Sequence, residues 1–233
     1  MRVAVLEDDI HVGQLISLWL ERAGHSQQLF ATGEAFKKAL SRESYDLLIL
    51  DWELPDTDGG KVLAWVRQNI DWPIPVIFAT ARDSEEDIVK GLMAGADDYM
   101  TKPVRRNEFM ARITALARRA NQDSDKKDAL NLPPYRIDIG ARSITCDGVL
   151  LDLTQKEFDL ALLLFRNPGR LLSRGYILES VWGRQPDFNT RTVDTHISRV
   201  RAKLGLTPEH GWRLNAIYNH GYRLEPVAER PAE

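Results

Sequence analysis

Carboxylate, hydroxyl and ammonium side chains stand at the ends of four short apolar runs. These side chains are Glu7 and Asp8, Asp51, Thr80, and Lys102. Clustered carboxylates repel one another, and a hard divalent cation such as Mg²⁺, which prefers oxygen ligands, relieves that repulsion. A carboxylate beside Mg²⁺, a lysine and a hydroxyl is suited to attack a phosphoryl group, giving an aspartyl phosphate. If these groups converge, the chemistry that they support is phosphoryl transfer to Asp51.

The apolar runs before these side chains predict buried parallel strands, which are continuous rather than alternating in hydrophobicity. The predicted strands are residues 2–6, 26–30, 46–50, 75–80 and 97–101, and the predicted helices are 10–23, 33–40, 59–68, 85–94 and 106–120. This alternation predicts a doubly wound α/β domain with five parallel strands. Right-handed crossovers bring the carboxyl ends of the strands to one edge, where such sheets bind ligands.

Each of these residues also has a simpler structural explanation. Asp51 can cap a turn, and residues 7–9 can form the N-cap and first turn of the next helix. Thr80 can be an ordinary strand-end hydroxyl, and Lys102 a solvated surface lysine. We expect Asp9 to be only a cap. Matching chemistry at four independent strand ends nevertheless favours one shared site.

The length of 233 residues and a hydrophobic content of 43% are typical of two ordinary globular domains. The single cysteine, Cys146, excludes a disulfide framework within the chain. The N-terminal run meets Glu7 too soon for a signal peptide, and no apolar run approaches the length of a membrane span. We therefore expect a cytoplasmic protein without membrane contact.

The charge is distributed unevenly. Residues 1–120 hold 15 Lys/Arg against 19 Asp/Glu, a net charge of −4, whereas residues 154–223 hold 11 against 6, a net charge of +5. An acidic half joined to a basic half indicates nucleic acid on the basic side. Ordinary surface variation also produces a charge of this size, so the asymmetry alone does not decide.

The second half of the chain predicts an α+β domain. Residues 121–131 are polar and aperiodic, as an interdomain linker would be. Strand-like pieces follow at 135–138, 142–146 and 149–151, then helices at 155–166, 174–182 and 191–204, a loop at 184–190, and a hairpin at 213–224. Three helices and a hairpin predict a winged helix-turn-helix, whose third helix occupies the major groove of DNA. An amphipathic helix with a solvated polar face explains the third helix equally well.

Residues 2–119 resemble the receiver domain of two-component response regulators. The matching pieces are Leu6-Glu7-Asp8, Asp51-Trp52-Glu53-Leu54-Pro55 with Asp58-Gly59, Thr80-Ala81-Arg82, and Gly95 to Pro103. The resemblance implies that a histidine kinase phosphorylates Asp51. It also implies a Mg²⁺ site formed by Asp8, Asp51 and the backbone carbonyl of Glu53, with Glu7 acting mainly through water.

The same resemblance implies further roles. Thr80 and Lys102 contact the phosphoryl group, the Lys102–Pro103 peptide bond is cis, and Thr80 and Tyr99 form the switch. The surface of residues 85–94, 97–101 and 106–119 is the usual dimer face, and its charged residues here are Lys90, Asp98, Glu108 and Arg112. Ile88 stands where relatives often carry a basic residue. The alternative is that these charged side chains pair within one chain or are solvated, in which case they would contribute little to stability.

The run from Arg191 to Lys203, with Leu153-Thr154, Glu157-Phe158 and Gly221-Tyr222-Arg223-Leu224, resembles the effector domain of the OmpR/PhoB subfamily. The resemblance implies duplex binding as a tandem dimer. The implied DNA contacts are Arg199 and Thr195 to bases, Thr192 and His196 to the backbone, Arg223 from the wing, and Arg191. Arg201 is expected to be structural. Ser198 replaces a common basic residue, and Tyr218-Asn219 replaces the usual Arg-Gly before the tip of the wing. Asn tolerates the positive φ of a turn, so the turn can still form.

The resulting hypothesis is a transcription factor switched by phosphorylation of Asp51. The predicted domains are a receiver at 1–120, a linker at 121–131, a winged helix-turn-helix at 132–226 and a tail at 227–233. The expected partners are a histidine kinase, double-stranded promoter DNA, a second copy of the chain upon activation, and RNA polymerase. Two alternatives stay open. One is a dimeric DNA-binding regulator that is independent of phosphorylation, and the other is a metal-dependent phosphatase with Asp51 as nucleophile and Glu53 as acid–base.

Overall fold

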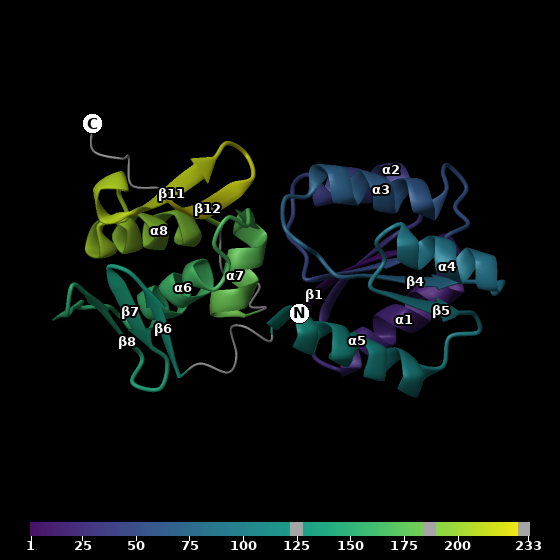
Figure 1. Cartoon of the computed structure of the whole chain (residues 1–233), viewed down its shortest axis with the longest axis horizontal. Coiled ribbons are helices and arrows are strands. Elements are labelled where there is room, and N and C mark those ends of the chain that lie inside the picture. Colours follow the sequence, from purple (N-terminus) through teal and green to yellow (C-terminus); the bar gives the residue numbers. More distant parts are fainter. Residues whose placement is uncertain (122–127, 184–189, 228–233) are drawn as a thin grey trace. The chain divides into compact units, whose positions relative to one another are not determined.

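The computed structural model describes residues 1–121, 128–183 and 190–227. The chain folds as two units, Met1–Gln122 and Asp123–Glu233 (Figure 1). No helix in the described part of the chain is long and apolar enough to cross a membrane.

A parallel sheet forms the centre of unit 1. Its strands among the described residues are β1 (Arg2–Leu6), β2 (Ser26–Phe30), β3 (Leu47–Leu50), β4 (Val76–Thr80) and β5 (Asp98–Thr101). They are hydrogen-bonded in the order β2-β1-β3-β4-β5, and every pairing is parallel. The predicted five-stranded α/β fold is therefore confirmed. Because β1 and β3 are neighbours, the residues that follow them must lie close together.

Helices cover both faces of this sheet (Figure 1). They are α1 (Ile10–Arg22), α2 (Gly33–Leu40), α3 (Gly59–Asn69), α4 (Glu85–Met93) and α5 (Arg106–Asn121). Ile16 of α1 and Phe109 of α5 pack on one face, and Phe36 of α2 and Val62 of α3 pack on the other. Each such fully buried side chain stabilises the fold by about 1.5–3 kcal/mol relative to exposure. The sheet is thus held between two apolar layers, leaving its carboxyl edge for polar chemistry.

Two acidic residues predicted to lie within strands precede them instead. The Asp46 carboxylate accepts a hydrogen bond from the backbone N–H of Arg2, at 2.8 Å, and Asp97 accepts one from Val76, also at 2.8 Å. Each carboxylate satisfies a donor at the start of a neighbouring strand, where the ladder has not yet begun. Asp9, as expected, is the N-cap of α1.

Unit 2 contains two antiparallel sheets around a helical layer. A four-stranded sheet comprises β6 (Ala129–Leu132), β7 (Tyr135–Asp138), β8 (Ser143–Cys146) and β9 (Val149–Leu150) among the described residues. The helices are α6 (Gln155–Phe165), α7 (Arg174–Trp182) and α8 (Thr190–Leu204), with a 3₁₀ turn at Pro208–His210. A second sheet joins β10 (Leu172–Ser173), β12 (Gly221–Pro226) and β11 (Trp212–Ile217). This is the predicted winged helix-turn-helix, with a sheet before it.

The predicted linker is too long at both ends. Asn121 still belongs to α5, and Ala129–Asn131 form most of β6, where Leu130 is paired with Ile137. Leu130 and Leu132 also pack against the core of unit 2, which explains why a run that looks polar becomes a strand. Residues 122–127 of the linker, 184–189 of the predicted loop and 228–233 of the tail lie outside the described residues.

Polar contacts connect the helices of unit 2 to its sheets. Thr154 and Glu157 form a capping box at the start of α6. The Glu157 carboxylate also accepts a hydrogen bond from Lys203 of α8 at 2.8 Å, and the Tyr135 hydroxyl donates to the Leu204 carbonyl at 2.6 Å. The turn between β11 and β12 contains Asn219 at φ +58°, in agreement with the expectation that Asn supports it. The contacts of Lys203 and Leu204 thus join α8 to α6 and to the four-stranded sheet.

Candidate functional site

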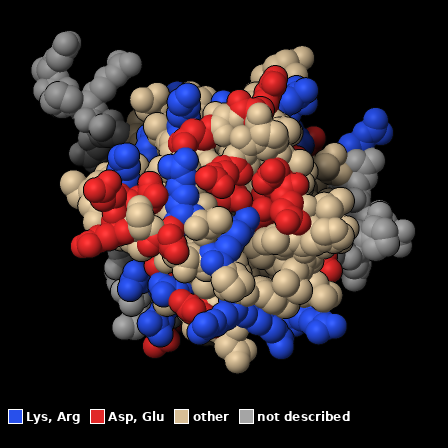
Figure 2. Space-filling view, turned by 90° about the vertical axis from the view of Figure 1, so that its right-hand side faces the viewer, with Lys and Arg blue, Asp and Glu red and all other residues tan. Residues whose placement is uncertain are grey.

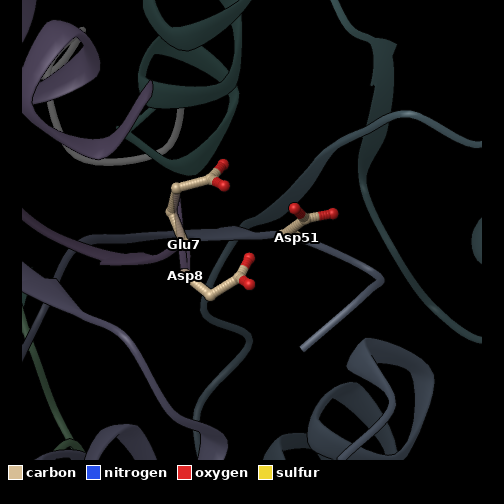
Figure 3. Close-up of side chains that lie close together, drawn as sticks. All are labelled: Glu7, Asp8 and Asp51. Atoms are coloured by element: carbon tan, nitrogen blue, oxygen red, sulfur yellow. The ribbon is translucent and has the colours of Figure 1, made fainter. Parts of the chain in front are cut away.

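Three carboxylates converge at the carboxyl edge of the sheet in unit 1. Glu7 and Asp8 follow β1, and Asp51 follows the adjacent strand β3. One carboxylate oxygen from each lies within 4.8 Å of the others, and the three groups point toward a common space (Figure 3). Glu7 and Asp51 are buried and Asp8 is exposed, so the cluster opens to solvent on one side. The predicted convergence of the acidic strand ends is therefore observed.

Lys102 reaches into this cluster from the segment after β5. Its Nζ donates to the Asp51 carboxylate at 2.6 Å and to the Glu7 carboxylate at 2.8 Å. Burial raises the pKa of the Glu7 carboxyl above its ordinary value, against the lowering effect of Lys102. For Lys102, burial alone would lower the pKa, but the hydrogen bonds to Asp51 and Glu7 outweigh it, and the pKa lies above its ordinary value. The lysine is therefore a fixed positive charge beside Asp51 and not a solvated surface residue.

The other Asp51 oxygen is held by the backbone. Oδ1 accepts hydrogen bonds from the N–H groups of Trp52, at 2.5 Å, and Glu53, at 3.3 Å. The loop that supplies these donors is closed by a bridge between Glu53 and Asp58, and Asp58 caps α3 through Gly60 N–H. Asp51 thus has one oxygen toward the backbone donors and one toward Lys102.

Gly59 allows α3 to start directly beneath the aspartate. A Cβ atom at this position would collide with the carbonyl oxygen of Asp51 and lie 2.8 Å from Cα of Trp52. Its N–H donates to the Trp52 carbonyl at 2.8 Å. Because backbone atoms cannot rotate away, only glycine fits here without moving the loop that holds Asp51.

Thr80 and Tyr99 lie on the two neighbouring strands. Thr80 ends β4, is fully buried, and accepts a weak hydrogen bond from Arg82 N–H at 3.4 Å. Tyr99 of β5 points inward, and its hydroxyl donates to the Arg82 carbonyl at 2.9 Å. The Lys102–Pro103 bond is cis, as the resemblance implied. The segment after Thr80 is therefore in contact with the Tyr99 side chain.

The charged residues expected at a dimer face are partly paired within the chain. Arg112 of α5 contacts Asp98 and Glu108, each at 2.8 Å. Lys90 is exposed on α4, and Ile88 is half-buried against the core. Figure 2 shows Asp and Glu side chains across the upper and middle part of one face, with Lys and Arg side chains among them and along its lower edge. The intrachain pairs do not test the predicted interface.

α8 presents its polar face outside the core of unit 2. Val193, Ile197, Val200 and Leu204 recur at the spacing of one helix face and are buried. The residues expected to contact DNA are exposed or half-buried, and they are Arg191, Thr192, Thr195, His196, Arg199 and Arg223. Arg223 also lies 3.6 Å from Glu225 on β12, and Arg201 donates to the Leu214 carbonyl at 2.8 Å. Arg201 thus has a structural contact, a hydrogen bond to a backbone carbonyl of β11.

Sequence reasoning missed several residues that shape these sites. Trp52 donates its indole N–H to Asp58 at 2.8 Å, and its ring packs on Phe78 with centroids 4.6 Å apart. Arg82 covers the Trp52 ring, with its guanidinium 5.5 Å from the ring centroid. The position of Trp52 directly after Asp51 was the available signal. For Arg82, the sequence offered no signal apart from its position two residues after Thr80.

A second missed group connects α8 to the wing. Asp194 accepts hydrogen bonds from Arg174 of α7, at 2.8 Å, and from the Tyr222 hydroxyl of β12, at 2.6 Å. The Arg174 guanidinium also lies 5.1 Å from the centroid of the Tyr222 ring. These contacts join the helix-turn-helix and the wing, although the three residues are far apart in sequence.

The donor set of the acidic cluster fits a divalent cation. All three carboxylates are hard oxygen ligands, and an exposed Asp8 leaves room for water, which Mg²⁺ retains when it binds proteins. The cluster lacks His and Cys, so it does not favour zinc. A receiver domain with an acidic cluster of this kind and a DNA-binding winged helix-turn-helix defines a class of signalling regulators.

Comparison with known proteins agrees with this class. Residues 3–114 match the response regulator receiver domain, and residues 148–224 match the C-terminal domain of transcriptional regulatory proteins. The chain is similar to the sensory transduction protein RegX3 of Mycobacterium tuberculosis, with 36% identity covering 96% of this chain and 98% of RegX3. It is also similar to the transcriptional regulatory protein ResD of Bacillus subtilis, with 34% identity covering 98% and 97%.

A solved two-component response regulator from Clostridium difficile is similar in structure, with a TM-score of 0.50, 26% identity, and coverage of 52% of this chain and 98% of that one. The chain belongs to the OmpR/PhoB subfamily of two-component response regulators. It is a DNA-binding transcriptional regulator, and its family consists of such regulators and not of enzymes.

Proposed function

We propose that Asp51 is the phosphoacceptor and that its phosphorylation by a histidine kinase promotes dimerisation and binding to tandem DNA half-sites. The observation that carries this proposal is the buried Asp51 carboxylate, with Lys102 at 2.6 Å and with Glu7 and Asp8 beside it. An O–P bond forms at Asp51 while the N–P bond of the donor phosphohistidine breaks. The leaving imidazole takes the electron pair of that bond.

The surrounding residues position and neutralise this reaction. Lys102 supplies positive charge to an Asp51 oxygen, and the N–H groups of Trp52 and Glu53 orient the other oxygen. Asp8, Asp51 and the Glu53 carbonyl are the proposed ligands of Mg²⁺, with Glu7 acting mainly through water, and the bound ion would offset negative charge on the phosphoryl oxygens. Thr80 is the proposed hydroxyl donor to the phosphoryl group.

Tyr99 and Thr80 are the proposed switch. The Tyr99 hydroxyl is bonded to the Arg82 carbonyl, two residues beyond Thr80, so a movement of Thr80 toward a phosphoryl group would strain or release that bond. The α4–β5–α5 surface, with Lys90, Asp98, Glu108 and Arg112, is the proposed dimer face. Because Arg112 already pairs with Asp98 and Glu108 within the chain, a dimer would exchange these contacts for contacts across the interface.

DNA is proposed to lie against the polar face of α8 and the wing. In this proposal Arg199 and Thr195 face bases, Thr192 and His196 meet the backbone, Arg223 makes the contact of the wing, and Arg191 is a further DNA-binding residue. Dimerisation through the receiver raises the effective concentration of the second module on the adjacent half-site. Phosphorylation would thus control DNA occupancy through linkage, without new DNA contacts. RNA polymerase is a proposed partner of the bound dimer.

Intact mass tests the phosphoacceptor directly. The chain is incubated with Mg²⁺ and acetyl phosphate beside Asp51→Ala, with Asp46→Ala as a control at an acid outside the cluster. A gain of one phosphoryl group in the wild type and Asp46→Ala, but not in Asp51→Ala, is expected. The gain should also raise the dimer fraction in light scattering. An equal response of dimerisation and DNA affinity in Asp51→Ala would refute the switch, and steady turnover of phosphate esters would support a phosphatase instead.

A further inference from the structure

Two histidines in unit 2 share the same local hydrogen bond. On α8, Nδ1 of His196 lies 2.9 Å from the carbonyl oxygen of Thr192, one turn earlier. In the turn between β11 and β12, Nδ1 of His220 lies 2.6 Å from the carbonyl oxygen of Tyr218. A carbonyl oxygen has no proton to donate, so Nδ1 must be the donor in both pairs. The neutral form of each ring therefore carries its proton on Nδ1.

This tautomer determines what the rest of each ring can bind. In the neutral ring the second nitrogen, Nε2, is only an acceptor. Phosphate oxygens are acceptors as well, so the neutral ring has no hydrogen bond to offer them through Nε2. Protonation turns Nε2 into a charged donor, and charge-assisted hydrogen bonds to phosphate are among the strong ones. Either ring can thus hold a phosphate through Nε2 only as an imidazolium ion.

Both histidines belong to the surface proposed to meet DNA. His196 is half-buried on the polar face of α8, and its ring packs edge-on against Trp182, with centroids 4.9 Å apart and planes at 70°. His220 is in the wing turn Tyr218-Asn219-His220, which has no Lys or Arg. The bond between Tyr222 and Asp194 joins the wing to α8. The wing turn therefore depends on a histidine for any positive charge.

We propose that His196 and His220 bind DNA phosphates as imidazolium ions, so that duplex binding takes up protons and strengthens as the pH falls from 8 to 6. This inference rests on the proposed DNA binding by α8 and the wing. Histidine is the side chain whose charge ordinarily changes within this pH range. Proton uptake would be a second signal for a regulator whose proposed control is phosphorylation of the other unit.

The charges around the two rings favour coupling to DNA. His196 lies on α8, which packs against α7 and α6, and the charged residues of these three helices are Arg191, Asp194, Arg199, Arg201, Lys203, Arg174, Glu179, Lys156, Glu157 and Asp159. The two strands that flank the turn of His220 carry Arg213, Arg223 and Glu225. Glu225 is 3.6 Å from Arg223, Asp194 is bonded to Arg174, and the Lys156 ammonium donates to the Val181 carbonyl. Cations outnumber acids in both sets, so both rings lie on elements that attract the phosphates of DNA.

The test compares DNA affinity across pH in the full chain. The probe is a fluorescent duplex enriched from a random library by the full chain itself, and anisotropy is read at pH 6, 7 and 8 at constant ionic strength without a phosphodonor. The variants are His196→Gln, His220→Gln and the double variant. His210→Gln is the matched control, because His210 lies in the same unit, in the turn after α8, with Nδ1 against a threonine hydroxyl. Circular dichroism at each pH monitors folding.

For the wild type and His210→Gln, DNA affinity should fall on the order of tenfold or more from pH 6 to pH 8, since one pKa unit at one site corresponds to about tenfold in affinity. For the double variant, DNA affinity should fall by less than about twofold over the same range. His220→Gln changes an exposed turn, so its partial loss of pH dependence is readable even if His196→Gln unfolds. Calorimetry in two buffers with different ionisation heats should show proton uptake on binding.

Equal pH dependence in the wild type and the variants, or zero proton uptake, would overturn the inference while leaving DNA binding intact. Failure of the full chain to enrich any duplex, with or without phosphorylation, would overturn the proposed function itself, and this inference with it. The two failures are therefore distinguishable.

Discussion

Gly59→Ala should damage phosphoryl transfer without touching any charged group of the site. The new methyl group would collide with the Asp51 carbonyl and lie 2.8 Å from Cα of Trp52, whereas ordinary contacts begin near 3.4 Å. The difference requires the backbone to move by about 0.6 Å or more. Since Trp52 donates to Asp51 Oδ1, that movement carries the hydrogen-bond donor away from the carboxylate.

The expected cost follows from the size of this displacement. Overpacking of this kind typically destabilises a fold by about 1–3 kcal/mol. For a unit of this size, the melting temperature would fall by roughly 3–15 °C. Misplacement by about 1 Å at a reacting centre can slow a reaction on the order of a hundredfold, so a decrease of at least about tenfold in phosphorylation rate is expected.

The assay is the rate of phosphoryl incorporation from acetyl phosphate, read by intact mass, together with calorimetric melting of the full chain. Gly60→Ala is the matched control. Its methyl group would lie 2.9 Å from Asp58 Oδ1, a side-chain atom that can rotate, and 3.4 Å from the Trp52 ring. Gly59→Ala should therefore be the worse variant in both measurements. Wild-type rate and melting in Gly59→Ala would show that the close approach does not position Asp51.

Three further predictions concern other contacts. In Glu157, hydrogen bonds from Lys203 and Thr154 outweigh the raising effect of burial and hold the pKa below its ordinary value. Because the folded-state pKa is lowered, the Glu157 carboxylate stabilises the fold at pH values above its unfolded pKa of about 4.3, and this stabilisation is lost as the pH falls through the folded-state pKa. The difference in urea midpoint between the wild type and Glu157→Gln should therefore be wide at pH 7 and should close below about pH 4. Tyr222→Phe removes the hydroxyl that is hydrogen-bonded to Asp194 and should weaken duplex affinity by roughly 1 kcal/mol, about fivefold. The far-ultraviolet circular dichroism should change little. Unchanged affinity would mean that this hydrogen bond does not position the wing. Removal of Mg²⁺ by EDTA should stop phosphorylation of Asp51 and alter Trp52 fluorescence, and a Trp52→Phe variant identifies the signal.

The core of the acidic site could be predicted because it depends on local sequence and on a general rule. Continuous apolar runs identify buried strands, and parallel crossovers bring the residues after them to one edge. Glu7, Asp8, Asp51 and Lys102 therefore meet in the structure as expected. The hydrophobic spacing on α8 likewise determined which face of this helix is buried and which is left polar and outside the core.

Other features depend on contacts between distant segments. The apolar side chains of β6 are too few to mark a strand, and pairing with β7 and packing on the core of unit 2 determine it. The pairing of Arg112 with Asp98 and Glu108, and the bonds among Arg174, Asp194 and Tyr222, require the packed helices and strands to be in place. Sequence patterns describe single elements and their order.

Residue types and their order along the chain thus determined the class of fold, the acidic site and the polar face of α8. Only the tertiary structure decided the partner of each charged or polar side chain. It showed that Gly59 leaves room for Asp51, that Trp52 supports the aspartate, and that His196 and His220 direct Nδ1 to their own backbone. The physical reason is that hydrogen bonds and close contacts depend on distances of a few tenths of an ångström, which a linear pattern does not specify.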